Sequence, residues 1–151
     1  MFDWLANPNR FNRITDKLQP YLAVISITSI ALGLYFGLLD SPKDYQQGHA
    51  VRIMYVHVPS AWLASALYLF LAVSSIFYLV WKHPLADLIS RSIVPIGTTF
   101  AFLTLITGSL WGKPMWGTWW VWDARLTSML ILFLFYIGYF LLSNAFERKI
   151  D

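Results

Sequence analysis

Residues 111–123 read W-G-K-P-M-W-G-T-W-W-V-W-D and hold five of the eight tryptophans of this chain. Apolar runs long enough to cross a bilayer flank the stretch, at residues 92–110 and 124–146. Gly112, Pro114 and Gly117 interrupt both helical and strand periodicity. The sequence therefore predicts a loop at one membrane face, whose indole rings offer wide aromatic planes to a large flat ligand.

Anchoring in the membrane interface is the simplest alternative role for these tryptophans, because indole rings are enriched among lipid headgroups. One or two of them at each helix end satisfy that role. Five within residues 111–122 exceed it, so we favour a surface for stacking or docking.

The composition of the whole chain indicates a membrane protein. The 151 residues are 58% hydrophobic and 13% charged, far from the balance of a soluble domain. We expect an all-α integral membrane protein with a single domain over residues 1–151. Its four transmembrane helices are predicted at residues 21–39, 59–81, 92–110 and 124–146. The second helix is predicted to start at Pro59, since proline suits a first helical turn. That start places His57 at the lip of the membrane.

Cysteine usage and charge narrow the classes of function. The chain has no cysteine, which excludes disulfides, thiolate metal sites and thioether-linked cofactors within it. Its net charge of +3 comes from the short loops of a membrane protein, and the sequence contains no nucleic-acid-binding motif. We therefore expect membrane lipid around the chain and no nucleic-acid partner.

The distribution of Lys and Arg predicts the orientation, because short loops rich in these residues stay in the cytoplasm. The two termini and the middle turn carry seven of them: Arg10, Arg13, Lys17, Lys82, Arg91, Arg148 and Lys149. The other side carries four: Lys43, Arg52, Lys113 and Arg125. We expect cytoplasmic termini and a tryptophan-rich loop that faces the periplasm or its equivalent.

The residues predicted on the outer face match the needs of one ligand, haem. An iron porphyrin needs an axial nitrogen, aromatic planes for its ring and cations for its propionates. His57 offers the nitrogen, the tryptophans the planes, and Arg52, Lys113 and Arg125 the cations. The alternatives are an ordinary interface histidine, arginines that reach toward headgroups, and Asp123 as a helix cap. His49 and His83 are interpreted as solvated.

A longer comparison of motifs points to a known family. The stretch W-G-T-W-W-V-W-D-A-R-L-T, residues 116–127, fits the W-G-x-x-W-x-W-D signature of haem-handling membrane proteins. The flanking W-G-K-P-M, the D-Y-Q-Q-G of residues 44–48 and the H-V-P of residues 57–59 resemble haem exporter protein C of cytochrome c maturation. The resemblance runs from about Asp44 to Phe146.

The resemblance implies a bacterial inner-membrane protein, or an organellar equivalent, that carries haem b (iron protoporphyrin IX) as cargo and is not an enzyme. It implies hand-over of haem to a periplasmic haem chaperone, beside ABC-transporter subunits and a small single-helix protein. The implied platform comprises Trp111, Trp116, Gly117, Trp119, Trp120, Trp122 and Asp123, with His57 as the axial ligand. Members of the family have six helices and a second histidine in a later outer loop, to which no residue of this chain corresponds. Whether that part is supplied elsewhere is left open.

Two other functions, a b-type cytochrome subunit and a permease subunit, are the alternatives to this one. A b-type cytochrome subunit needs paired histidines inside helices, whereas the three histidines here are predicted at helix ends or in loops. A permease subunit would show ionisable residues at membrane depth, and the spans offer only a run of hydroxyls: Ser74, Ser75, Thr98, Thr99 and Thr104. Hydroxyls in membrane helices more often bond to the backbone.

Overall fold

The computed structural model describes residues 8–82 and 84–147, and helices account for most of them. The chain separates into two compact units that divide after Pro42, and each is treated by itself. Four helices are long and apolar enough to cross a membrane: Asn12–Asp40, His49–Trp81, Leu85–Trp116 and Ala124–Ala145. The predicted all-α architecture with four membrane-spanning helices is confirmed.

The first unit consists of helix α1 (Pro8–Leu34), which continues as the π-helical segment η1 (Tyr35–Asp40). The helix therefore extends well before the predicted range of 21–39. The prediction counted only apolar residues, whereas the backbone stays helical through the polar residues ahead of Pro20. At the other end the Ser41 hydroxyl donates to the Gly37 carbonyl over 2.7 Å and closes the last turn.

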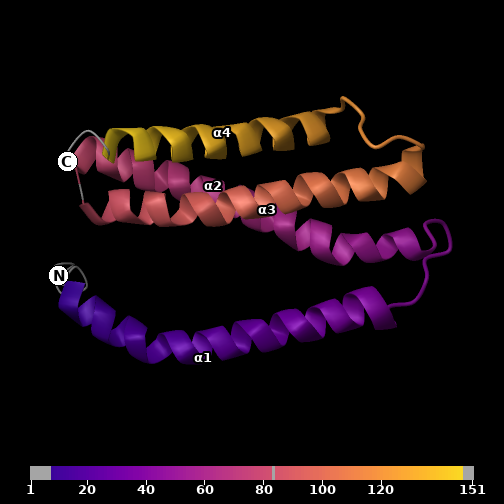
Figure 1. Ribbon diagram of the computed structural model, residues 1–151, viewed down its shortest axis with the longest axis horizontal. Helices are drawn as coiled ribbons and strands as arrows, with labels where there is room; N and C mark the ends of the chain where they lie inside the picture. The colour runs from indigo at the N-terminus through magenta and orange to yellow at the C-terminus, as the bar shows by residue number, and fades with distance from the viewer. Residues whose placement is uncertain (1–7, 83, 148–151) are drawn as a thin grey trace. The chain divides into compact units, whose positions relative to one another are not determined.

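The second unit holds a short 3-10 segment, η2 (His49–Ile53), and the helices α2 (Met54–Trp81), α3 (Pro84–Trp116) and α4 (Ala124–Glu147). Helix α3 packs against both α2 and α4. Figure 1 shows these three helices running along one another, with the turn after α2 at one end and the loop of residues 117–123 at the other. That turn reverses at Lys82, whose φ of 53° is left-handed.

The core of the second unit is centred on Tyr136 of α4. Its side chain is fully buried, and its hydroxyl donates to the Ala64 carbonyl of α2 over 2.8 Å. Its ring rests on Gly97 of α3, where a Cβ atom would collide with it. Small residues thus let three helices approach around one phenol, which is how membrane helices pack without a hydrophobic driving force between them.

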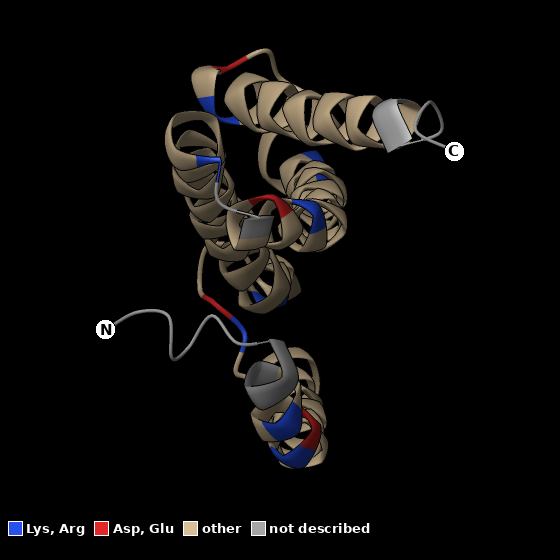
Figure 2. Ribbon diagram, turned by 90° about the vertical axis from the view of Figure 1, so that its left-hand side faces the viewer, with Lys and Arg blue, Asp and Glu red and all other residues tan. Residues whose placement is uncertain are grey.

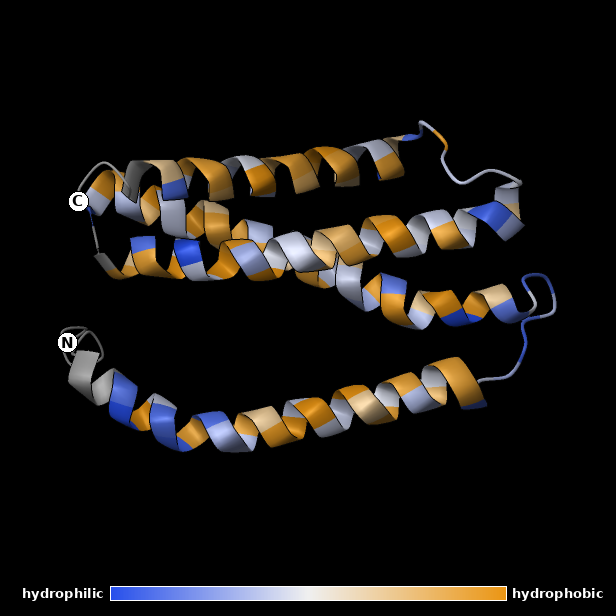
Figure 3. Ribbon diagram, in the orientation of Figure 1, coloured by the Kyte–Doolittle hydropathy of each residue, from blue (hydrophilic) through white to orange (hydrophobic). Residues whose placement is uncertain are grey.

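Polar and charged residues are concentrated near the helix ends. Figure 3 shows hydrophobic residues along most of each helix and hydrophilic ones toward the ends. After Arg125, helix α4 carries no charged residue until its last turn (Figure 2). The hydroxyls at membrane depth bond to the backbone: Thr98, Thr99 and Thr104 each donate to the carbonyl four residues earlier. They offer no polar pathway of the kind that a permease needs.

Helix α2 begins at Met54 and not at Pro59, so the prediction that His57 precedes the helix is wrong. Proline was used as a start signal, yet the helix accommodates Pro59 in its second turn. The loss of one backbone N–H is tolerated in membrane helices where neighbouring polar groups compensate. Pro59 frees the carbonyl of Tyr55, and the Ser60 hydroxyl donates to the next carbonyl, that of Val56, over 2.7 Å.

Helix α3 is longer than the predicted 92–110 at both ends. It begins at Pro84, and Ser92, where the helix was expected to begin, lies inside it with its hydroxyl donating to the Leu88 carbonyl over 2.9 Å. At the other end it runs through Gly112 and Pro114 to Trp116. The expectation that residues 111–123 form one loop is therefore wrong, and only residues 117–123 lie outside the helices.

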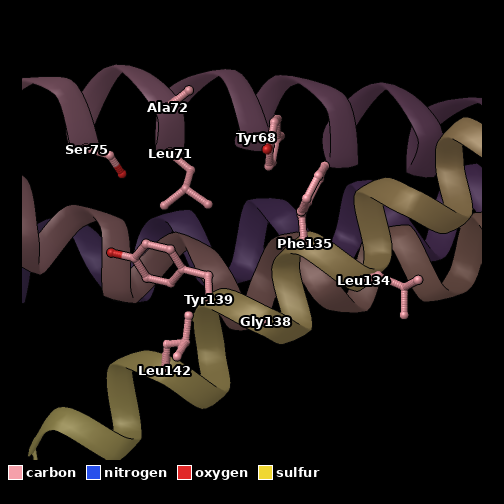
Figure 4. Close-up of a pocket in the computed structure, with 9 residues that line it drawn as sticks. All are labelled: Tyr68, Leu71, Ala72, Ser75, Leu134, Phe135, Gly138, Tyr139 and Leu142. Atoms are coloured by element: carbon pink, nitrogen blue, oxygen red, sulfur yellow. The ribbon is translucent and has the colours of Figure 1, made fainter.

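An apolar groove of about 430 Å³ opens between α2 and α4 (Figure 4). Its walls are mostly hydrocarbon, and small residues at Ala72 and Gly138 give it depth. The residues that line it are Tyr68, Leu71, Ala72, Ser75, Leu134, Phe135, Gly138, Tyr139 and Leu142.

Candidate functional site

His57 lies in the first turns of α2 and is half-buried against α3. Its Nδ1 atom is 3.0 Å from the Thr107 hydroxyl oxygen. Gly108 permits this approach, because a Cβ atom there would already be 3.2 Å from the imidazole Cε1. The imidazole is thus seated on one face of α3 and not on a flexible loop.

Trp111, one helical turn beyond Thr107 on α3, is the aromatic neighbour of His57. The two ring centroids are 5.9 Å apart, with the planes inclined at 58°. The indole Nε1 donates to the side-chain oxygen of Gln47 over 3.1 Å. Gln47 belongs to a tight turn in which the Asp44 carboxylate accepts from the backbone N–H of Gln46 and of Gln47, both over 2.8 Å. The turn before η2 therefore holds Trp111 in place from 64 residues away.

The tryptophan-rich stretch divides at Gly117, whose φ of 74° is left-handed. The Gly117 N–H donates to the Lys113 carbonyl over 3.0 Å, which ends α3 in the manner of a glycine C-cap. Gly112 was expected to break the helix, but it serves close packing, since a Cβ atom there would lie 3.1 Å from the Trp116 ring. Trp111 and Trp116 are helical, and the other indoles belong to the loop.

The five indoles form two pairs and one separate ring. Trp111 and Trp116 have centroids 6.5 Å apart, and Trp120 and Trp122 meet edge to face at 5.4 Å. Trp122 is 76% exposed. The Trp120 Nε1 atom is buried with no hydrogen-bond partner in the described chain. Because a buried donor without an acceptor is costly, this N–H is a candidate donor to a bound polar group.

The cations of this end lie against the indoles. The Arg125 guanidinium is 5.5 Å from the Trp116 ring centroid, and the Lys113 ammonium is 5.7 Å from that of Trp119. The ammonium also donates to the Gly117 carbonyl over 3.0 Å. These contacts hold positive charge beside aromatic faces.

Asp123 serves both as a cap and as a partner for Arg125. One carboxylate oxygen accepts from the Leu126 N–H over 2.8 Å, which caps α4, and the other accepts from Arg125 over 2.7 Å. The Leu126 N–H and then Arg125 hold the pKa of Asp123 below its usual range. The helix cap that the sequence offered for Asp123 is present.

A cavity of about 170 Å³ connects α2, α3 and α4 at this end and brings His57 and Arg125 to one wall. It is smaller than the ~300–1,000 Å³ of a typical pocket for a drug-sized ligand, so a porphyrin would fit there only in part. The cavity is lined by His57, Ala61, Thr104, Leu105, Arg125, Leu126 and Met129. Arg52 in η2 and the loop residues Trp119 and Trp122 are not in its wall.

The side chains at this end fit haem. Iron in a porphyrin already has four nitrogen ligands and needs only an axial one, which His57 would supply without a cluster of metal-binding residues. Within residues 8–82 and 84–147 no three His, Cys, Asp or Glu residues gather to hold a bare metal ion. The orphaned Trp120 N–H and the Arg125 guanidinium are suited to acidic groups at the porphyrin edge.

Comparison with known proteins identifies the family of this chain. The family model described as "Heme exporter protein C" matches residues 1–151, the whole chain. This chain belongs to that family. The protein of that name from Bradyrhizobium diazoefficiens is 52% identical over 143 residues, which cover 95% of this chain and 54% of the relative. The one from Escherichia coli strain K12 is 46% identical over 145 residues, which cover 96% of this chain and 59% of the relative.

A third relative is a mitochondrial protein of Marchantia polymorpha whose name refers to cytochrome c biosynthesis. It is 53% identical over 108 residues, which cover 72% of this chain and 47% of its own length. The chain thus spans about half to three fifths of the relatives it matches. Family membership and the four apolar helices make it a multi-pass membrane protein.

Sequence reasoning named most residues of this site but missed Thr107 and Gln47. Thr107 had a signal that was not used, because Thr104, Thr107, Gly108 and Trp111 recur at helical spacing and form one stripe of α3. Gln47 stood in the D-Y-Q-Q-G motif, but nothing in that motif named its partner, which lies 64 positions away. His83, Arg148 and Lys149 lie outside the described residues.

Proposed function

We propose that this chain holds haem at the outer face of a membrane and passes it to a periplasmic haem chaperone during cytochrome c maturation. The observation that carries the proposal is the convergence of His57, Trp111 and Arg125 at one end of three packed helices. Imidazole, indole and guanidinium are the groups that a haem requires at its iron, ring and propionates.

Each group has a defined task in this proposal. His57 supplies the axial nitrogen, and the indoles of Trp111 and Trp116 flank the ring. Arg125 offers positive charge for the propionates, together with Lys113 of the tryptophan-rich stretch and Arg52, which is close in sequence to His57. The cargo is haem b, iron protoporphyrin IX, which the chain binds and releases unchanged. We infer a carrier and not an enzyme.

The setting follows from charge and family membership. Lys and Arg are more numerous on the side of the termini, which favours cytoplasmic termini and a periplasmic tryptophan-rich end in a bacterial inner membrane or its organellar equivalent. The name heme exporter, borne by the relatives, supports work within a larger export assembly. We expect ABC-transporter subunits and a small single-helix protein in it, and the exposed Trp122 suits a protein partner.

The decisive experiment is the visible spectrum of the full chain purified in detergent, titrated with haemin. His57→Ala is expected to lose most of the Soret shift that wild type shows, because alanine offers no axial nitrogen. His49→Ala is the matched control, a second histidine of the same end that lies in η2 and is exposed. Equal titrations for wild type and His57→Ala would refute the proposal.

The hand-over step needs its own test. Trp120→Ala with Trp122→Ala is expected to weaken cross-linking to the chaperone in the haem-loaded state while the protein still accumulates in the membrane. Both residues lie in the loop and outside the apolar helices, so their loss removes little packing of the helices. Normal cross-linking combined with poor accumulation would show that these tryptophans are membrane anchors.

One observation favours a second candidate, a b-type cytochrome subunit. His57 lies inside α2, not in a loop, and electron-carrying haems of membrane bundles are held by helical histidines. Such a haem needs a second histidine opposite, and His49, the other histidine that the structure describes, precedes α2 in η2. A low-spin bis-histidine spectrum from this chain, lost on His49→Ala, would support the cytochrome.

A further inference from the structure

A neutral imidazole has one N–H and one lone pair, and only the lone pair binds iron. The hydrogen bond made by one ring nitrogen therefore decides whether the other is ready to act as a ligand. For His57 the nitrogen with a partner is Nδ1, which faces the Thr107 hydroxyl at 3.0 Å. The hydrogen between these two atoms is carried either by the Thr107 oxygen or by the His57 Nδ1 atom.

The surroundings of Thr107 settle which atom donates. Its Oγ1 is 2.6 Å from the Leu103 carbonyl and 3.3 Å from the Thr104 carbonyl, and carbonyls only accept. The 2.6 Å separation is short for an O–H···O bond, which commits the hydroxyl proton to Leu103. A lone pair of Oγ1 is then left toward His57, and Nδ1 has to carry the hydrogen.

One further contact agrees with this assignment. Gly108 has no side chain, and a Cβ atom there would lie 3.2 Å from Cε1, so the Nδ1–Cε1 edge rests directly on α3. Within residues 8–82 and 84–147 the hydrogen bond of the imidazole runs to Thr107 of α3, and the ring also lines the cavity shared with Arg125.

We propose that Thr107 is a positioning residue that fixes the Nδ1–H tautomer of His57 and thereby keeps the Nε2 lone pair available for haem iron. This inference rests on the proposed function, since it concerns the same histidine. It adds a side chain of α3 that touches no ligand itself and acts through its hydrogen bond.

The tautomer is tested first, without haem. The full chain, labelled with ¹⁵N-histidine in detergent, is expected to show a protonated Nδ1 and an unprotonated Nε2 for His57, with His57→Ala assigning the signals. Thr107→Val keeps the branched shape but removes the acceptor, and it should shift His57 toward the Nε2–H tautomer. Thr107→Ser retains the hydroxyl and should restore the wild-type shifts.

Haem binding is tested next, by haemin titration of the same proteins. Outer-shell partners of a metal-bound histidine commonly contribute about 10- to 100-fold in affinity, so Thr107→Val is expected to weaken haemin binding by about that factor. The serine variant should stay near wild type. Thr99→Val is the matched control, because Thr99 bonds to its own helix in the same way but is exposed and distant in sequence from the site.

The outcomes separate the two proposals. Loss of haemin affinity in His57→Ala and Thr107→Val, with rescue by serine and no change in Thr99→Val, supports both. Loss in His57→Ala alone, with an unchanged His57 tautomer in Thr107→Val, overturns the role of Thr107 and leaves the proposed function standing. Equal binding by wild type and His57→Ala overturns the axial ligand and with it the role of Thr107.

Discussion

The middle of the three-helix unit and its tryptophan-rich end are built in opposite ways. Around Tyr136 the helices meet through Gly97 and Ala64, and the one buried phenol hydroxyl has its acceptor. At the tryptophan-rich end His57 lines a cavity, Trp122 is 76% exposed, and the Trp120 N–H is buried with no partner among the described residues. We therefore expect the middle to set stability, and the proposed site at the end to contribute less to it.

The largest expected effect comes from filling the tightest point of the middle. Gly97→Ala adds a methyl group where the Tyr136 ring leaves no space, and overpacking of this kind costs about 1–3 kcal/mol in the free energy of unfolding. Gly138→Ala is the control, since its Cβ atom would have no neighbour within 4 Å. Denaturation in mild detergent measures both, and equal midpoints would show that the middle is not the stable region.

A smaller effect is expected from the hydroxyl of the same core. Tyr136→Phe leaves the packing in place and removes only the bond to the Ala64 carbonyl, which should cost about 1 kcal/mol. Tyr139→Phe, in the lining of the apolar groove, is the matched control. Haemin titration should not distinguish these variants from wild type, and a loss of haemin binding in Tyr136→Phe would break the separation between middle and end.

At the tryptophan-rich end, a substitution should change haemin binding more than the free energy of unfolding. Gln47→Leu removes the acceptor of the Trp111 N–H in a half-exposed site, so unfolding should change by only about 0.5 kcal/mol. Trp111 fluorescence and haemin binding should change more visibly, because the indole beside His57 loses its anchor. Gln46→Leu is a suitable control, because the side chain of Gln46, the neighbour of Gln47 in sequence, is exposed. Unchanged haemin binding would mean that the position of Trp111 is irrelevant to the ligand.

The smallest effect concerns pH and the cap of α4. The Leu126 N–H and Arg125 depress the pKa of Asp123, so its contribution to stability is fully present above the ordinary value of about 3.9 and is lost as pH falls through the lower folded value. Stability measured from pH 8 to pH 5 should therefore show no change from this residue. Asp123→Asn should remove the additional loss at lower pH, and an identical acid profile would contradict the assignment.

The sequence predicted the helices of this protein better than their ends. Apolar length was enough to find four spans, because burial in lipid needs only that. The ends were misplaced where a proline or glycine was interpreted as a breaker: Pro59 and Gly112 both lie inside helices. Pro59 is compatible with the second turn of α2, and Gly112 makes room for the Trp116 ring. Such roles depend on the neighbours in space, which a local pattern does not contain.

The same contrast holds for the site. His57, Arg125 and the indoles were named from their chemistry alone, and the structure brings His57, Trp111 and Arg125 together. Arg52 was grouped with them because it is close in sequence, but it is not in the cavity wall. Thr107 was passed over because a lone hydroxyl in an apolar span has no distinctive pattern. Its importance comes from the residue that faces it on α2.

Gly97 and Thr107 both lie in helix α3, about 15 Å apart along its axis at 1.5 Å per residue. A slip of this helix by a single residue would turn it by about 100° and move Thr107 away from His57. The collision between any side chain at position 97 and the Tyr136 ring opposes such a slip. Gly97 therefore keeps Thr107, three turns away on α3, in register with His57 of α2. A substitution at position 97 that still allows folding should be detectable as a change in the tautomer of His57.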